Sequence, residues 1–198
     1  MPILFRWLAA IVAAVLVLAG ASVRLSASAP TAEPASFAAT DVTGVPWGRD
    51  FKLLGHDGRN HGLADFHGKV VALYFGYTQC PDVCPTTMAT LAQAVRMLGN
   101  EGERVRGVFI TVDPRHDTPQ VLAKYVTTFH PSFIGLYGDK QAIQHTAREF
   151  HVVASRSAHS TPVFLFDPAG RLRLIVRPEA TPESIAHDMR LLLADTPA

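Results

Sequence analysis

The segment VVALYFGY, residues 70–77, constrains the fold more than any other stretch of this chain. Its residues are continuously apolar and do not alternate with polar ones, which is typical of a central strand buried on both faces. Such a strand needs other strands beside it and helices above and below it. The rest of the sequence must therefore supply the remaining layers of an α/β fold.

Segments with strand and helix patterns alternate on both sides of this run. We expect two short strands around a turn at Asp57-Gly58, and later strands at 105–112 and 133–138. Helices are expected to end at Gly99, to open at Thr118-Pro119, to begin at Asp139, and to span 182–194. A β-hairpin over 162–176 adds an antiparallel strand, so the sheet should be mixed. This order favours an α/β sandwich with a mixed central sheet and is compatible with a thioredoxin-like fold.

The two cysteines of the chain follow the central strand directly, in the stretch FGYTQCPDVCP. Cys80 and Cys84 stand in a C-x-x-x-C spacing at a strand-to-helix turn, and three explanations compete. A structural disulfide would close a very short loop and would stabilise the fold by only about 2 kcal/mol in the loop-entropy model. A redox-active dithiol is favoured by the helix N-terminus, whose partial positive charge lowers the pKa of a thiol.

A metal site is the third explanation. Two thiolates four positions apart can point the same way from one turn, and soft thiolates select Cu(I), zinc or iron–sulfur clusters. A closed zinc site needs four ligands, and two cysteines cannot hold a cluster alone. Cu(I) tolerates two or three soft ligands and fits the number of thiols best. A histidine as third ligand would also allow Cu(II).

His159 is singled out among the nine histidines by its position. It lies in SRSAHSTPVFLF, a polar loop that leads into a strongly apolar strand. In a thioredoxin-like sheet, this loop lies beside the N-terminus of the first helix. We therefore expect His159 to lie next to Cys80 and Cys84.

The first 24 residues are a separate segment of the chain. An apolar stretch of about 17 residues, from Trp7 to Val23, is flanked by Arg6 and Arg24, and it falls between the usual lengths of a signal-peptide core and a membrane span. We favour an uncleaved anchor with the bulk of the chain outside the cytoplasm, on the periplasmic face of a bacterial inner membrane. The alternative is a cleaved signal peptide and a soluble periplasmic domain. Either location permits disulfides.

Small residues and prolines dominate residues 25–49, so we expect a flexible linker there and the folded domain over 50–198. The hydrophobic content of 48% is enough for a sizeable core. The formal net charge is +1 and there is no long basic run, so nucleic-acid binding is poorly supported.

Four stretches resemble the SCO/SenC family, whose members help to assemble the copper centre of cytochrome c oxidase. They are FGYTQCPDVCPTT, FITVDPRHDTPQVLAKYV, FIGLYG and AHSTPVFLFDPAGR, in the order of the family. The resemblance covers the chain from about residue 50 to the end. It implies a thioredoxin-like fold and copper binding by Cys80, Cys84 and His159. It also implies the copper-site subunit of the oxidase as partner, with an upstream copper donor or thiol reductant.

The chain departs from the family in two places. Ala158 stands where an aspartate often precedes the histidine, which bears on how the imidazole of His159 is oriented. Pro162 is also unusual, and we assign it no role. For Asp82, the role of a helix cap competes with that of a charge beside the site or a contact with a partner. Asp113 and Asp117 resemble family positions, and we expect them to fix a loop and cap the next helix rather than to act as ligands.

Two functions of different classes remain. The leading hypothesis is a copper-binding assembly protein, a metallochaperone that passes copper on by ligand exchange and is not a turnover enzyme. The alternative is a thiol–disulfide oxidoreductase that reduces the cysteines of the oxidase copper site, which does not require His159. Peroxide reduction is weaker, because Tyr77 stands where peroxiredoxins place a threonine. A plain interaction domain leaves the thiol placement unexplained.

Overall fold

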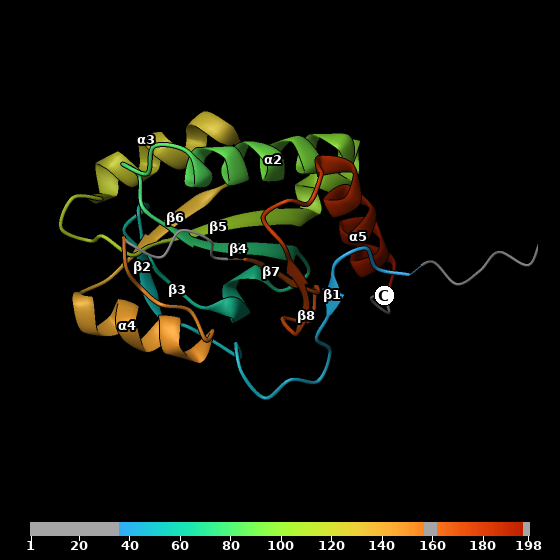
Figure 1. The fold of residues 1–198 in the computed structure, drawn as a ribbon, viewed down its shortest axis with the longest axis horizontal. Helices are drawn as coiled ribbons and strands as arrows, with labels where there is room; N and C mark the ends of the chain where they lie inside the picture. The colour runs from blue at the N-terminus through green and yellow to red at the C-terminus, as the bar shows by residue number, and fades with distance from the viewer. Residues whose placement is uncertain (1–35, 157–161, 196–198) are drawn as a thin grey trace, which may run out of the picture. The chain divides into compact units, whose positions relative to one another are not determined.

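The computed structural model describes residues 36–156 and 162–195. Within these ranges, eight strands form one sheet in the order β1-β8-β7-β4-β5-β6-β2-β3 (Figure 1). Strands β4, β5 and β6 run parallel, whereas β7 runs antiparallel to both β4 and β8, so the expected mixed sheet is confirmed. The strands are β1 Thr40–Asp41, β2 Leu53–Gly55, β3 Asn60–His61, β4 Val70–Gly76, β5 Val105–Thr111, β6 Ile134–Tyr137, β7 Val163–Phe166 and β8 Leu172–Val176.

Helices cover both faces of the sheet. Figure 1 shows α2, α3 and α5 on one face and α4 on the other. Side chains of Thr118, Asp139 and Thr181 accept a backbone N–H in the first turns of α3, α4 and α5, which fixes where these helices begin. The helices are α2 Val83–Met97, α3 Pro119–Phe129, α4 Lys140–Glu149 and α5 Pro182–Ala194, with the 3-10 helices η1 Leu63–Phe66 and η2 Gly99–Arg104.

Strand β4 lies in the middle of the sheet, and all of its residues are buried. Ala72 and Tyr74 pack into the cluster that α2 and α5 cover, and Leu73 and Phe75 pack into the cluster on the α4 side. Removing each large side chain from water stabilises the fold by about 1.5–3 kcal/mol. Burial on both faces explains why the run is continuously apolar.

Residues 36–49 depart from the expected flexible linker, because they belong to the folded unit that starts at Ser36. Strand β1 pairs with β8, with Thr40 opposite Ile175. The buried carboxylate of Asp188 in α5 accepts the backbone N–H groups of Ala38 and Ala39, each at 2.8 Å. The small residues of this segment show no apolar periodicity, and their partners lie far along the chain. The local sequence therefore did not predict these contacts.

The predicted anchor or signal segment, residues 1–24, lies outside the described residues. Over 36–156 and 162–195, no helix has the length and apolar character needed to cross a membrane.

Candidate functional site

The two cysteines lie where β4 gives way to α2. Cys80 is in the loop after β4, and Cys84 is in the first turn of α2. The backbone N–H of Cys84 donates to the Cys80 sulfur at 3.4 Å, and both thiols are free. The carboxyl ends of the parallel strands β4, β5 and β6 meet at this edge of the sheet, where α/β folds commonly place their sites.

The two thiols have different surroundings. Cys80 is partly exposed, whereas Cys84 is only 5% exposed. Burial opposes ionisation of Cys80, but hydrogen bonds to its sulfur from Cys84, Asp82 and Tyr77 outweigh this effect, so the pKa of Cys80 is lowered. Burial raises the pKa of the Cys84 thiol to about 11. The hydroxyl of Tyr74, on β4, donates to the Cys84 sulfur at 3.6 Å.

Gly76 lets the sulfur of Cys84 approach the end of β4. A Cβ at this position would lie 2.8 Å from Cε2 of Phe109 and 3.0 Å from Sγ of Cys84. The space beside the thiols is correspondingly small, a cavity of about 20 Å³ bounded in part by Val112, Val153 and both cysteines. This is about the room of one water molecule, so a larger partner must reach the thiols from the exposed side of Cys80.

A buried carboxylate joins the cysteine loop to the neighbouring loop. Asp117, only 1% exposed, follows β5 and accepts three hydrogen bonds. The backbone N–H and the hydroxyl of Thr78 donate to it at 3.1 and 2.5 Å, and the hydroxyl of Thr111 donates at 2.6 Å. Asp117 therefore fixes the loop as expected, although the side chain that caps α3 is that of Thr118.

A second group of charged side chains reaches the cysteine loop from the segment before β7. The guanidinium of Arg156 lies 5.1 Å from the centre of the Tyr77 ring and 3.3 Å from a carboxylate oxygen of Asp113. Asp113 also contacts Nδ1 of His116 at 2.8 Å. Cation–π and ionic contacts thus hold the chain at Arg156 against the loop that carries Cys80.

His159, the expected third ligand, lies outside the described residues, as does Ala158. Ser155 lines the thiol cavity and Arg156 reaches Tyr77, so the chain arrives at the thiols shortly before position 159. Within the described ranges, no group of three or more His, Cys, Asp or Glu side chains could hold a metal ion.

Asp82 stands at the N-cap position of α2 without a capping bond from its side chain, which corrects the expected role.

The sequence did not reveal several residues that shape the site. Tyr74 reads as one apolar residue of a buried strand, and nothing local shows that its hydroxyl faces a sulfur. Thr78 and Arg156 act through partners far along the chain, and Thr111 reaches Thr78 only through the carboxylate of Asp117. Only the family resemblance of FITVDPRHDTPQVLAKYV pointed to the loop after β5.

A sequence profile of the family SCO1/SenC matches residues 40–194. The mitochondrial SCO2 homolog of Mus musculus is 40% identical over 133 residues, which are 61% of this chain and 52% of that protein. The chain thus spans about half the length of this mitochondrial relative.

Solved structures show the same fold. The apo Sco1 protein of Thermus thermophilus is 36% identical, with a TM-score of 0.67 over 80% of this chain and 96% of that one. ScoI of Bradyrhizobium japonicum, solved with copper bound, is 31% identical, with a TM-score of 0.63 over 72% of this chain and 96% of that one. The thioredoxin-like α/β fold expected from the sequence is confirmed.

Proposed function

The chain belongs to the SCO1/SenC family, and from this premise we propose that it binds copper and delivers it to the copper centre of cytochrome c oxidase. It acts as a metallochaperone, with copper as its cargo. Solved relatives that carry copper, from Bradyrhizobium japonicum and Arabidopsis thaliana, support the choice of metal.

One observation carries the proposal: two free thiols of different exposure meet at the carboxyl end of β4. The donor set fits Cu(I), because soft thiolates bind this ion in low coordination numbers. Cys80 and Cys84 would hold the ion, and His159 would complete the site. The partial exposure of Cys80 leaves one ligand open to an incoming protein, as stepwise ligand exchange requires.

The partners follow from the same proposal. The recipient is the copper-site subunit of the oxidase, and an upstream copper donor or thiol reductant supplies the metal or keeps the thiols reduced. The domain works outside the cytoplasm, held at the membrane by the N-terminal segment 1–24 or released after cleavage of that segment.

Competition for copper tests the proposal. Residues 30–198 are reduced without oxygen and titrated with Cu(I) against a chelator, as wild type, Cys80→Ser and His159→Ala. His145→Ala, an exposed histidine of α4, is the matched control. We expect about one copper per wild-type chain, loss in Cys80→Ser, affinity lowered by about tenfold or more in His159→Ala, and no change in the control. A reduced wild type that yields all its copper to the chelator contradicts the proposal.

The difference between the two thiols favours a second candidate, a thiol–disulfide oxidoreductase acting on the cysteines of the oxidase copper site. An accessible sulfur with a lowered pKa, backed by a buried thiol, is the arrangement of an attacking and a resolving cysteine. Reduction of a peptide disulfide at an unchanged rate by His159→Ala, together with weak copper binding, would favour this candidate over the carrier.

A further inference from the structure

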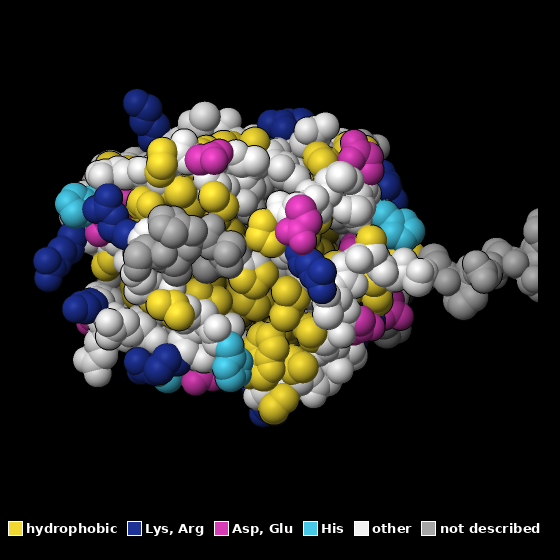
Figure 2. Space-filling model, viewed as in Figure 1, with side chains coloured by type: hydrophobic (Ala, Val, Ile, Leu, Met, Phe, Trp, Pro, Cys, Tyr) yellow, Lys and Arg dark blue, Asp and Glu magenta, His cyan; other side chains and the backbone are white. Residues whose placement is uncertain are grey.

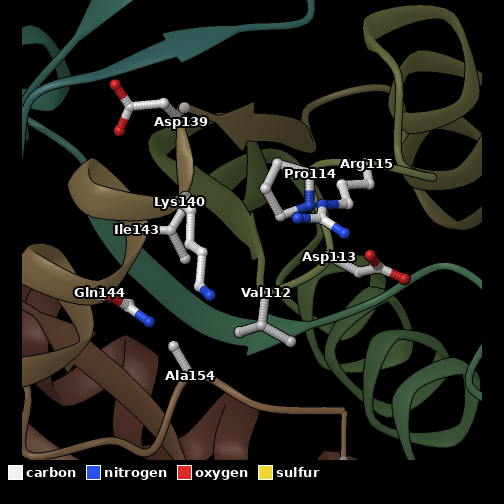
Figure 3. A pocket seen from close by; sticks show the side chains of 10 residues that line it. Val112, Asp113, Pro114, Arg115, Asp139, Lys140, Ile143, Gln144 and Ala154 are labelled. Atoms are coloured by element: carbon white, nitrogen blue, oxygen red, sulfur yellow. The ribbon is translucent and has the colours of Figure 1, made fainter.

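A second, much larger cavity lies beside the thiol site. Its volume is about 420 Å³, and it opens between the start of the loop after β5, the N-terminal half of α4 and the segment before β7 (Figure 3). Val112 lines both this cavity and the thiol pocket. A molecule that engages Cys80 therefore has this cavity directly next to it.

The acidic side chains around the cavity have partners, whereas the basic ones do not form ion pairs with described residues. The carboxylate of Asp113 is held by His116 and Arg156, and that of Asp139 accepts the N–H of Ala142 at 2.7 Å. Arg115 and Lys140 form no ion pair or side-chain hydrogen bond with any other residue in the described part of the chain. Among the described residues, the cavity thus offers two cations without an ionic partner, while its two carboxylates already accept contacts.

The side chains point in a way that strengthens this imbalance. In Figure 3, Lys140 extends between Gln144 and Val112, and the guanidinium of Arg115 lies on the facing wall beside Pro114. The carboxylates of Asp113 and Asp139 turn away from the space between them. An incoming carboxylate would meet both cations and neither acid.

An exposed apolar side chain, that of Val153, lies at the edge of the thiol pocket. Val153 is 70% exposed, lines the thiol pocket and precedes Ala154, which lines the larger cavity. Figure 2 shows apolar side chains gathered on the face that this view presents, with lysine and arginine side chains mostly toward its left side. A polypeptide can cover Val153 and reach Arg115 and Lys140 at the same time, because these residues line neighbouring cavities.

We propose that the Arg115–Lys140 cavity receives an acidic side chain of the polypeptide that takes up copper from Cys80 or undergoes thiol–disulfide exchange with it. The cavity is a docking surface for a segment with Asp or Glu close to its own cysteine. This inference rests on the proposed function and names the chemistry of its partner. Charge complementarity of this kind mainly raises the rate of association and makes it depend on salt.

Disulfide probes of different charge test the docking surface. The reduced full chain is mixed with symmetric disulfides of the peptides Ac-Gly-Cys-Gly-X-X-NH2, where X is Glu, Gln or Lys. The Cys80 thiolate attacks one probe sulfur and releases one peptide thiol, and Cys84 then displaces the second. Two electrons and two thiol protons pass to the two peptides, and the protein keeps a Cys80–Cys84 disulfide.

We expect the Glu probe to react about three- to tenfold faster than the Gln probe at about 20 mM salt, and the Lys probe to react slowest. This order should vanish in Arg115→Gln/Lys140→Gln and at about 500 mM salt. Lys69→Gln/Arg104→Gln, which removes the same charge at the amino ends of β4 and β5, should keep it.

The outcomes separate this proposal from the proposed function. Equal rates for the three probes, or equal effects of the two double variants, overturn the docking surface, while copper binding in competition with the chelator stands unaffected. Thiols that react with no probe overturn both the docking surface and the exchange role. Binding of free succinate to the cavity together with equal rates for the three probes would identify a small carboxylate as the occupant and overturn the polypeptide.

Discussion

The sulfur of Cys80 accepts the backbone N–H of Cys84 at 3.4 Å and stays partly exposed, whereas the sulfur of Cys84 lies buried under the hydroxyl of Tyr74. The exposed sulfur of Cys80 can react with another sulfur directly. The buried sulfur of Cys84 can react only after the site has opened, or can bind a metal that replaces its proton. Both candidate functions need such a division between the two thiols.

Alkylation should reveal this division. In reduced, metal-free protein, we expect iodoacetamide to modify Cys80 at least about tenfold faster than Cys84, because Cys80 is accessible and its pKa is lowered, while burial raises the pKa of Cys84 to about 11. The thiolate fraction of Cys80 rises as the pH passes its lowered pKa, so its alkylation rate should reach half-maximum at a lower pH than that of an unperturbed cysteine. Mass spectrometry over a pH series measures both rates, with Cys84→Ser as control. Equal rates would contradict this assignment.

At the scale of elements, the site depends on how the end of β4 meets α2 and the loop after β5. Gly76 admits the Cys84 sulfur, and Asp117 holds Thr78 and Thr111 together. These contacts place the cysteine loop without using either thiol. Their loss should move the loop more than it weakens the rest of the sheet.

Gly76→Ala should destabilise the fold by about 1–3 kcal/mol, because the new methyl group would crowd Phe109 and Cys84. Gly107→Ala is a matched control, since its methyl group would crowd Phe133 at the amino end of β5. Chemical denaturation should show a loss for both variants. Only Gly76→Ala should change the alkylation rate of Cys84, and an unchanged rate would show that the close approach at Gly76 does not position that sulfur.

Asp117→Asn should lower the free energy of unfolding by about 1–3 kcal/mol, because an amide nitrogen would face buried hydrogen-bond donors. It should also increase hydrogen exchange at the amide of Thr78, which donates to this carboxylate. Glu101→Gln, an exposed acid of η2, is the control. A loss of stability without faster exchange at Thr78 would mean that Asp117 does not hold the cysteine loop.

Considered as a whole molecule, the domain closes its sheet with a strand that precedes the expected boundary. Removal of residues 36–42 would take away β1 and leave the buried carboxylate of Asp188 without the N–H donors of Ala38 and Ala39. We expect a chain that starts at Thr43 to unfold at least about 2 kcal/mol more easily than one that starts at Ser36. Urea denaturation of the two chains measures the difference. Equal midpoints would show that residues 36–42 do not stabilise the domain and belong to the linker.

The predictable parts of the fold are those whose cause is local in the sequence. The apolar period of α2, the Thr-Pro start of α3 and the turn of the last hairpin each carry their own signal, and the structure contains all three elements. Strand β1 was missed because only two of its residues pair, and its partners stand more than 130 residues away. For the site, spacing brought attention to Cys80 and Cys84, whereas Tyr74 and Arg156 come close only through the topology.

The two hydrogen bonds that Ala38 and Ala39 donate to Asp188 also have a mechanical consequence. Figure 1 shows the described chain leaving the domain beside α5, at the opposite end from the junction of β4 with α2. A pull on the N-terminal chain would load the short β1–β8 pairing and the two bonds to Asp188 first. The end of the sheet that carries the thiols would bear no load until these contacts broke. A force on the N-terminal chain therefore need not distort the geometry of Cys80 and Cys84.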